Sequence, residues 1–384
     1  MTKKIYLDYA GTTPMDPRVE RVVLRHLKND WGNASSVHEV GQQAKKVIED
    51  SRKKVAEVLG CKTQEIIFTG SGTESDNLAI FGIARAYKKL GKHIITSKIE
   101  HPAILRSCQQ LEAREGFKVT YLDVGESGII DAGAVKRAIR SDTVLVSVMY
   151  ANNEIGTVQS ITEIAKAIGR FKNHKPIFHT DACQAGGALS LNVNGLGVDL
   201  MTLNGSKIYG PKATGCLFVR RGIDLVPLIV GGSQERGLRA GTESPALIAG
   251  FAKALELADA KRVKEGTRLI KLRDYLIAKI LSGISGSYLN GDAARRLPNN
   301  INISFDDVHG EMLMLVLDQM GIQVSTGSAC TSTLTEPSHV IRALGLPEAM
   351  TRGNIRITLG RRTTKKDADC VVSALFKAIN RLRQ

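Results

Sequence analysis

Several patterns that would assign a function directly are missing from this chain of 384 residues. Its six cysteines contain no CxxC pair, which argues against a disulfide framework or a thiolate zinc site. The zinc-protease motif HExxH, the Walker phosphate loop and the dinucleotide-binding fingerprint GxGxxG are also absent. No apolar run approaches the roughly 20 residues of a membrane helix, and no signal-peptide-like stretch begins the chain. We therefore expect a soluble cytoplasmic protein with no membrane partner and no metal site.

The charge of the chain is large and positive, at +15, although 43% hydrophobic and 24% charged residues are ordinary for a globular protein. Such a charge permits attraction to RNA or to an acidic partner protein. The basic residues are interleaved with acids in helical stretches such as residues 39–60, and no RNA-binding motif accompanies them. We do not expect direct nucleic-acid binding.

Short β-branched runs alternate with amphipathic stretches through the first two thirds of the chain. Apolar residues at three- and four-residue spacing predict helices between several of the runs. This alternation is typical of an α/β protein whose largely parallel sheet has helices on both faces. Ligand-binding residues are then expected at the carboxyl ends of the strands. The predicted strands cover residues 93–101, 118–124, 142–153, 176–184, 198–207 and 215–221.

A long helical pattern over residues 244–284 follows without a strand, as in a connector between two domains. Beyond it the order of elements changes, which predicts a smaller α+β unit. Its predicted strands and helices cover residues 287–291, 300–305, 309–321, 323–328, 354–360 and 367–383.

Polar side chains collect where the predicted strands end. A buried acid such as Asp181 needs a cationic or hydrogen-bonding partner. Lys207 stands in a turn rich in glycine and proline, and a long cationic side chain at the end of a strand in such a turn can serve to bind a ligand. Several such residues in succession indicate one shared ligand. The set comprises His101, Asn152, Asn153, Glu154, Asp181, Gln184 and Lys207.

Pyridoxal 5′-phosphate is a ligand that needs these residue types together. Its aldehyde forms a Schiff base with a lysine, an acid pairs with its protonated ring nitrogen, and a flat side chain covers the ring. Its phosphate suits a helix start such as that of Ser71, Gly72 and Thr73, where free N–H groups and the helix dipole favour an anion. The sequence therefore predicts a cofactor bound through Lys207.

With these motifs, the chain resembles the cysteine desulfurases of the NifS/IscS type, class V of the fold-type I pyridoxal-phosphate enzymes. The resemblance implies a large domain with a mainly parallel, seven-stranded type of sheet over residues 15–258. A small α+β domain that carries the catalytic cysteine would comprise residues 1–14 and 259–384. The matching motifs are YLDYAGTTP, GNASSVH, TGSGTESDN, EHPAI, NNEIG, TDACQ, KIYGPK, RAGTES, STGSACTS and IRITLG, in the order of the family.

The resemblance implies a role for each residue around the cofactor ring. Lys207 would hold the cofactor, and Asp181 would pair with the ring nitrogen. His101 would stack on the ring and act as an acid–base. Gln184 and Asn153 would contact the phenolic oxygen. Whether His101 or Lys207 performs each proton transfer stays open.

At the phosphate end, the family implies that Gly72 and Thr73 hold the phosphate and that Thr242 reaches the phosphate of a neighbouring subunit. A homodimer with shared active sites follows. One segment departs from the family, which usually has serine, any residue and histidine before the lysine, whereas this chain has Asn204 and Ser206 at these positions. Both can donate hydrogen bonds to a phosphate, but a histidine's possible charge is lost. We expect weaker cofactor retention or a compensating donor, with unchanged chemistry.

For the substrate, the family implies L-cysteine, with its carboxylate held by Arg356 beside Asn153. Cys330 matches the nucleophile, among small polar residues of the kind that a mobile loop needs. Its thiolate would take the sulfur, which leaves a persulfide and releases alanine. The persulfide would pass to an acceptor for iron–sulfur cluster assembly or tRNA thiolation. The family's housekeeping members often carry a further C-terminal tail that engages the iron–sulfur scaffold, and Gln384 follows the last predicted helix directly, so the acceptor stays open.

Two other hypotheses compete with this one. A selenocysteine lyase, or another class V lyase or aminotransferase, would use the same cofactor but would be largely indifferent to loss of Cys330. A basic RNA-associated protein with a degenerate cofactor site would be colourless and would bind RNA in a salt-sensitive way.

Overall fold

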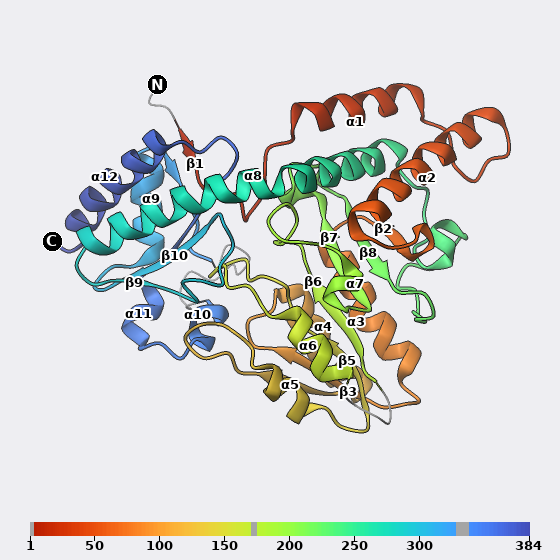
Figure 1. Ribbon diagram of the computed structural model, residues 1–384, viewed down its shortest axis with the longest axis horizontal. Helices are drawn as coiled ribbons and strands as arrows, with labels where there is room; N and C mark the ends of the chain where they lie inside the picture. The colour runs from red at the N-terminus through yellow and green to blue at the C-terminus, as the bar shows by residue number, and fades with distance from the viewer. Residues whose placement is uncertain (1–3, 170–174, 328–337) are drawn as a thin grey trace.

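The computed structural model describes residues 4–169, 175–327 and 338–384. Its most extended element is α8 (Pro245–Gly283), which crosses Figure 1 from the α12 side to a position below α1 and packs against helices of both halves of the molecule. The described ends of the chain lie on the same side, beside α12 (Lys365–Leu382). The bounds of α8 confirm the connector helix predicted over residues 244–284.

The central element is a seven-stranded mixed sheet in the order β2-β8-β7-β6-β5-β3-β4. Five adjacent strands, from β4 to β7, run parallel, whereas β8 is antiparallel to both of its neighbours. The sheet agrees with the predicted α/β fold of the fold-type I class, and the six predicted strands all exist. The strands are β2 (Ile66–Thr69), β3 (His93–Ser97), β4 (Lys118–Leu122), β5 (Thr143–Ser147), β6 (Ile177–Asp181), β7 (Leu200–Asn204) and β8 (Gly215–Val219).

Both faces of this sheet are buried. Neighbouring residues of a strand point to opposite faces, so Ile94 belongs to the core under α3 and α4, and Ile95 to the core on the other side. Continuous apolar strands are what a sheet covered on both faces requires. The helices of this half are α1 (Pro17–Asn29), α2 (Glu39–Leu59), α3 (Gly72–Tyr87), α4 (Pro102–Glu115), α5 (Ala132–Ala138), α6 (Ile161–Gly169) and α7 (Val193–Leu196).

A third apolar core lies at the other end of α8, where Leu272 and Leu276 pack with Leu7 from the N-terminal segment. Two small sheets surround it, the antiparallel β12-β10-β9 and the parallel pair β1-β11. The predicted α+β unit is thus present, while its exact boundaries stay a prediction. Its elements are β1 (Ile5–Tyr6), β9 (Ser287–Leu289), β10 (Asn300–Phe305), α9 (Gly310–Gln319), β11 (Ile322–Gln323), α10 (His339–Ala343), α11 (Glu348–Arg352), β12 (Asn354–Thr358) and α12.

Local sequence signals explain where several helices begin. Pro17, Pro102 and Pro245 stand at the first position of α1, α4 and α8, where the missing N–H of proline costs no hydrogen bond. At the start of α3, the side chain of Ser71 accepts a hydrogen bond from the N–H of Glu74. Helices α3 and α4 thus begin directly beyond the carboxyl ends of β2 and β3, which brings their N-terminal residues to one edge of the sheet.

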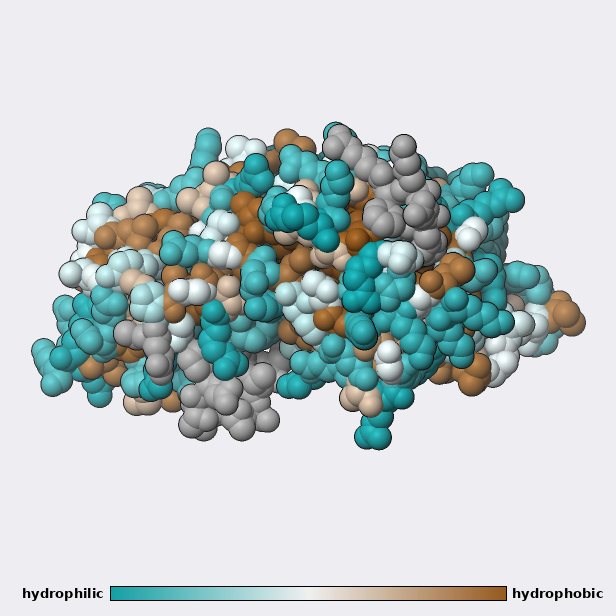
Figure 2. All heavy atoms as spheres, turned by 90° about the horizontal axis from the view of Figure 1, so that it is seen from below, coloured by the Kyte–Doolittle hydropathy of each residue, from teal (hydrophilic) through white to brown (hydrophobic). Residues whose placement is uncertain are grey.

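The surface carries exposed apolar side chains at one end of the molecule. Trp31 and Val37, between α1 and α2, are 74% and 93% exposed, and Val230 is 79% exposed. Figure 2 shows hydrophobic side chains among hydrophilic ones across this face, some of them at the end where α1 leads into α2. Among the described residues, no helix is long and apolar enough to cross a membrane.

A buried ion pair joins α2 to the loop before α8. Arg52, 4% exposed, donates two hydrogen bonds of 2.7 and 2.8 Å to the carboxylate of Glu235, which also accepts from the N–H of Phe68 at 2.9 Å. Glu235 has a φ of 44°, in the left-handed region that a residue with a Cβ adopts at a cost. The pair therefore holds the short helix η3 (Gln234–Gly237) in place.

Replacement of Glu235 by alanine should lower the free energy of unfolding by about 3 kcal/mol, because the buried Arg52 guanidinium then keeps only the exposed Glu49 carboxylate, 3.1 Å from its Nε, as an ionic partner. The shift of the urea midpoint, multiplied by the m value, measures it. Glu115→Ala is the matched control, since its partner Arg85 is 34% exposed, and should lose at most about 1 kcal/mol. Equal losses in the two variants would contradict the assigned role of the buried pair.

Candidate active site

The turn that carries Lys207 lies at the carboxyl end of β7. The chain leaves Asn204 through the short helix η2 (Gly205–Lys207), and the Lys207 ammonium donates a hydrogen bond to the carbonyl of Gly11. A Cβ on Gly205 would lie 2.2 Å from the Thr214 hydroxyl, so only glycine fits at this close approach. The predicted position of Lys207 at a strand end is confirmed.

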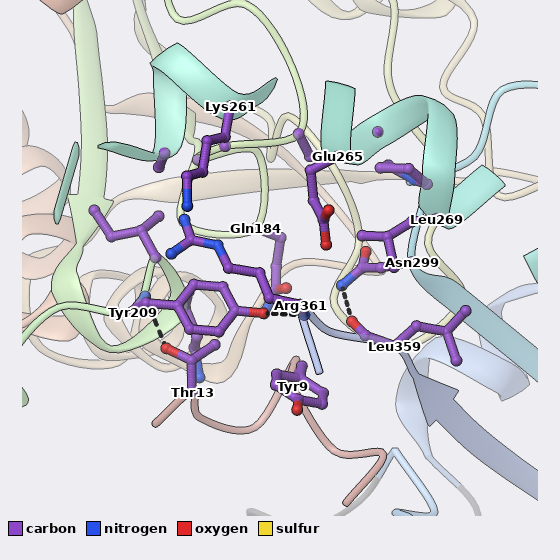
Figure 3. Close-up of a pocket in the computed structure, with 18 residues that line it drawn as sticks. Tyr9, Thr13, Gln184, Tyr209, Lys261, Glu265, Leu269, Asn299, Leu359 and Arg361 are labelled. Atoms are coloured by element: carbon purple, nitrogen blue, oxygen red, sulfur yellow. Dashed lines mark hydrogen bonds between the residues drawn. The ribbon is translucent and has the colours of Figure 1, made fainter. Parts of the chain in front are cut away.

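The N-terminal segment fixes this turn from the other side. The N–H and the hydroxyl of Thr13 both donate to the carbonyl of Ser206 at 2.9 Å, and the N–H of Tyr209 donates to the Thr13 hydroxyl at 2.8 Å. Arg361 stacks on the Tyr209 ring with its guanidinium 3.9 Å from the ring centre. Figure 3 shows these side chains around a cavity that Gln184 and Lys207 also line. The lysine turn is therefore held by residues far away in the sequence.

Asp181 is the last residue of β6 and is almost fully buried. Its carboxylate accepts a hydrogen bond of 2.9 Å from the N–H of Cys183. A second buried acid, Asp76 of α3, lies behind it with its Oδ1 3.8 Å from Nε2 of His179, and this Oδ1 has no hydrogen-bond partner among the described residues. Burial and the charge of Asp181 raise the pKa of Asp76 well above its usual range.

His101 begins α4 directly beyond β3. Its Nδ1 accepts a hydrogen bond of 3.1 Å from the N–H of Ala103, so the neutral ring carries its proton on Nε2. Burial lowers the pKa of His101, the carboxylate of Asp181 raises it, and the ammonium of Lys207 lowers it further. The Asp181 carboxylate and the Lys207 ammonium thus both act on the His101 imidazole, which is expected if the three residues share one site.

Glu100 is a fully buried acid next to this histidine. Its carboxyl accepts hydrogen bonds from the Ser97 hydroxyl at 2.6 Å and from the N–H of Met149 at 3.0 and 3.1 Å. Burial raises the pKa of Glu100 to about 8, and Asp181 adds to the rise, while these hydrogen bonds oppose it. Asp181 thus lies close to two other buried acids, Asp76 and Glu100, whose pKa values are both raised.

The predicted phosphate end lies at the start of α3. Gly72 is close-packed there, since a Cβ on it would lie 2.7 Å from Sγ of Cys183 and 3.2 Å from Cβ of Asn204. The Ser206 hydroxyl donates to Oδ1 of Asn204 at 2.8 Å, while Thr73, in the first turn, is exposed. Asn204 thus lies beside the start of α3, and the Ser206 hydroxyl is linked to this helix start through its hydrogen bond to Asn204.

The predicted substrate residues lie on the side of the small sheets. Arg356 of β12, 4% exposed, donates to the carbonyl of Asn153 at 3.1 Å and pairs with Asp8 at 2.7 Å. Its Nε is buried with no hydrogen-bond partner among the described residues. Gln184 donates to the carbonyl of Ala10 at 3.1 Å. Arg356 and Asn153 are therefore in contact, as predicted, and the Nε of Arg356 is left as a hydrogen-bond donor for a ligand.

Two predicted residues, Cys330 and Thr242, are not placed in the site. Cys330 lies outside the described residues, which end at Gly327 and resume at Ser338. Thr242 is exposed on the loop before α8, and its role toward a neighbouring subunit stays a prediction that one chain does not test.

Several site residues were missed in the sequence. Asp8 lies in the first matching motif and Glu100 directly precedes His101, so both stood within reach of the strand-end argument. Asp76 lies in the motif TGSGTESDN but on the helix rather than at a strand end, and His179 lies within a strand, so neither was assigned a role until packing brought them together. Glu154 was noted among the strand-end residues but received no role.

The raised pKa of Glu100 predicts a pH-dependent stability. Between its ordinary value of 4.5 and about 8, the unfolded chain loses the Glu100 proton while the folded chain keeps it, so the free energy of unfolding falls as pH rises. Glu100→Gln removes this loss. From pH 5 to pH 8 its stability should improve relative to the unsubstituted protein by on the order of 2–3 kcal/mol. Denaturant titrations of both proteins at the two pH values measure the change, and a constant difference would contradict the assignment.

Comparison with known proteins identifies the family. Residues 5–371 match the aminotransferase class-V family. The chain is 49% identical over 383 residues to the cysteine desulfurase IscS of Dictyoglomus turgidum, which covers 100% of this chain and 96% of that protein. It is 45% identical over 381 residues to the cysteine desulfurase IscS of Methanosarcina thermophila, which covers 99% and 93%. A solved NifS-like protein has a TM-score of 0.92 and 33% identity, over 98% of this chain and 99% of that one. The chain therefore belongs to the aminotransferase class-V family and, within it, to the cysteine desulfurases of the IscS and NifS type.

Proposed function

We propose that this enzyme removes sulfur from L-cysteine, gives L-alanine and leaves a persulfide on Cys330. The observation that carries the proposal is the convergence of Lys207, Asp181 and His101 at the carboxyl edge of the sheet, where both charges act on the imidazole. One C–S bond of the substrate breaks and one S–S bond forms. L-cysteine and the Cys330 thiol together contain every atom of the two products, so the step needs no outside oxidant.

The residues at the sheet edge fit pyridoxal 5′-phosphate. Asp181 is a buried acid that a protonated ring nitrogen can pair with, and Lys207 lies at the mouth of the same edge. Gly72 and Thr73 begin α3, where the first N–H groups of a helix suit a phosphate, and Asn204 lies beside Gly72. When bound, this cofactor withdraws electrons from the Cα of the substrate.

The side chains divide the remaining work. His101 carries its proton on Nε2, so it presents a donor and suits the role of acid. The amine of Lys207 suits the role of base. Gln184 and Asn153 would contact the phenolic oxygen of the cofactor. The unpartnered Nε of Arg356 supports its role toward the substrate carboxylate, with Asp8 holding the other side of the guanidinium.

A homodimer with shared sites is part of the proposal. Thr242 would reach the phosphate bound in the second subunit. Its exposed position and the exposed apolar side chains of Trp31, Val37 and Val230 support a partner surface. Val230 lies shortly before Thr242 in the sequence. A dimer interface that covers Val230 would therefore also bring Thr242 close to the second subunit.

The persulfide would then pass to an acceptor protein for iron–sulfur cluster assembly or tRNA thiolation in the cytoplasm. The five described cysteines are free thiols, as expected in a reducing compartment. Persulfide transfer also needs such a compartment, because an oxidised Cys330 has no thiolate to accept sulfur.

Alanine release from L-cysteine with a thiol reductant present tests the proposal in the unsubstituted protein and in Cys330→Ala. We expect the variant to lose at least about 100-fold in rate, because it lacks the nucleophile. Cys370→Ala, on the exposed face of α12, is the matched control and should keep full activity. Equal alanine release by Cys330→Ala would show a lyase that needs no thiol, such as a selenocysteine lyase. A colourless protein without activity would favour the RNA-associated alternative.

The departure before Lys207 predicts a change in cofactor affinity. Ser206→His restores the residue type usual in the family and offers the phosphate a second donor, which can be charged. We expect the dissociation constant of pyridoxal 5′-phosphate to fall about tenfold, which is roughly 1.4 kcal/mol. Titration of the apoprotein by absorbance measures it. Ser206→Asn, which adds no charge, is the control, and an equal gain there would exclude charge as the cause.

A further inference from the structure

We propose that Glu154 is a positioning residue that ties down both ends of the segment bearing Cys330. Its carboxyl contacts Gly327, the last described residue before this segment, and Ser338, the first one after it. The inference deepens the proposed function and rests on it, because it assigns the tie to the delivery of Cys330 to the substrate.

The bond at the second end is short and buried. The Ser338 hydroxyl donates to Oε2 of Glu154 at 2.5 Å, and both side chains are almost fully buried. The same hydroxyl accepts from the N–H of Val340 and so caps α10. The start of α10, where the segment ends, is therefore fixed to the turn that follows β5.

At the Gly327 end of the segment, the Glu154 carboxyl occupies the space that a side chain at position 327 would need. A Cβ on Gly327 would lie 2.2 Å from Oε2 of Glu154 and 2.9 Å from its Cδ. Gly327 also has a φ of +60°, which other residues adopt only with strain. The two ends of the segment thus meet at one oxygen atom, although ten residues separate them in the sequence.

Glu154 itself is held firmly enough to act as an anchor. Its N–H donates to Oδ1 of Asn152 at 2.8 Å. Its carbonyl accepts from the side-chain amides of Asn300 and Asn302 of β10, at 3.1 and 3.2 Å. The anchor therefore belongs to the turn after β5 and to the small antiparallel sheet at the same time.

The charge environment links this anchor to the substrate residues. Burial raises the pKa of Glu154 to about 7, against the Ser338 hydrogen bond and the Arg356 guanidinium, which both lower it. Arg356 lies on β12 and is also paired with Asp8. A carboxyl that contacts both ends of the segment therefore also lies in the field of the residue that would bind the substrate carboxylate.

The test compares Glu154→Ala, Ser338→Ala and the double variant. One turnover with L-cysteine is stopped at intervals, and the persulfide on the Cys330 peptide is measured by mass spectrometry. Each single variant should form it at least about tenfold more slowly, and the double variant should be no slower than Glu154→Ala, because one contact is removed in all three. Glu154→Gln keeps an acceptor for Ser338 and should stay within about threefold of the unsubstituted rate.

A second readout separates positioning from damage to the thiol. The rate of alkylation of Cys330 by iodoacetamide is measured in the cofactor-free protein, with the exposed Cys370 as the internal standard. We expect this rate to stay within about threefold in every variant, since the thiol itself is unchanged. Glu65→Ala, a buried acid with two backbone hydrogen bonds at the far edge of the sheet, is the control for loss of stability alone.

Two results would overturn the inference. One is an unchanged persulfide rate in Glu154→Ala, and the other is a fall in alkylation that parallels the fall in persulfide. If the unsubstituted protein forms no persulfide on Cys330, the proposed function fails first, which separates the two failures.

Discussion

The whole site depends on how the buried carboxyl groups at the carboxyl edge of the parallel sheet are stabilised. A carboxyl removed from water must be protonated, hydrogen-bonded or paired with a cation. Burial raises the pKa of Asp76 and Glu100, which favours the protonated form of each. Asp181 lies between them and has the N–H of Cys183 and the nearby charge of Lys207. The raised pKa of these two neighbours limits the negative charge around Asp181, as the proposed pairing of Asp181 with a single cationic ring nitrogen would require.

The same edge depends on contacts between distant parts of the chain. The segment from Leu7 to Asp16 crosses from the small sheets to the lysine turn, where Thr13 bonds to Ser206. At its start, Asp8 pairs with Arg356, which is 348 positions away. Arg356 and the lysine turn thus both contact the segment from Leu7 to Asp16, so a shift of the small sheets relative to the large one would act on both.

Much of this architecture could be read from the sequence, because it follows from local patterns. Apolar runs bounded by turns located six strands, and a three- and four-residue spacing located α8. The position of Lys207 after a strand was equally visible. The pairing of His179 with Asp76 could not be read in this way, since it depends on how α3 crosses the sheet. The same holds for Glu154, whose contacts at Gly327 and Ser338 join three separate segments.

The phosphate end shows how a departure from a family pattern can be tolerated. The Ser206 hydroxyl is directed to Oδ1 of Asn204, which fixes the amide so that its Nδ2 faces the start of α3. Neither side chain carries a charge, and the first turn of α3 offers N–H dipoles. A phosphate held by dipoles alone depends on their close alignment, which explains the tight packing at Gly72 against Cys183 and Asn204. If Thr242 of a second subunit supplies the further donor, as proposed, cofactor binding and dimer formation should be thermodynamically linked.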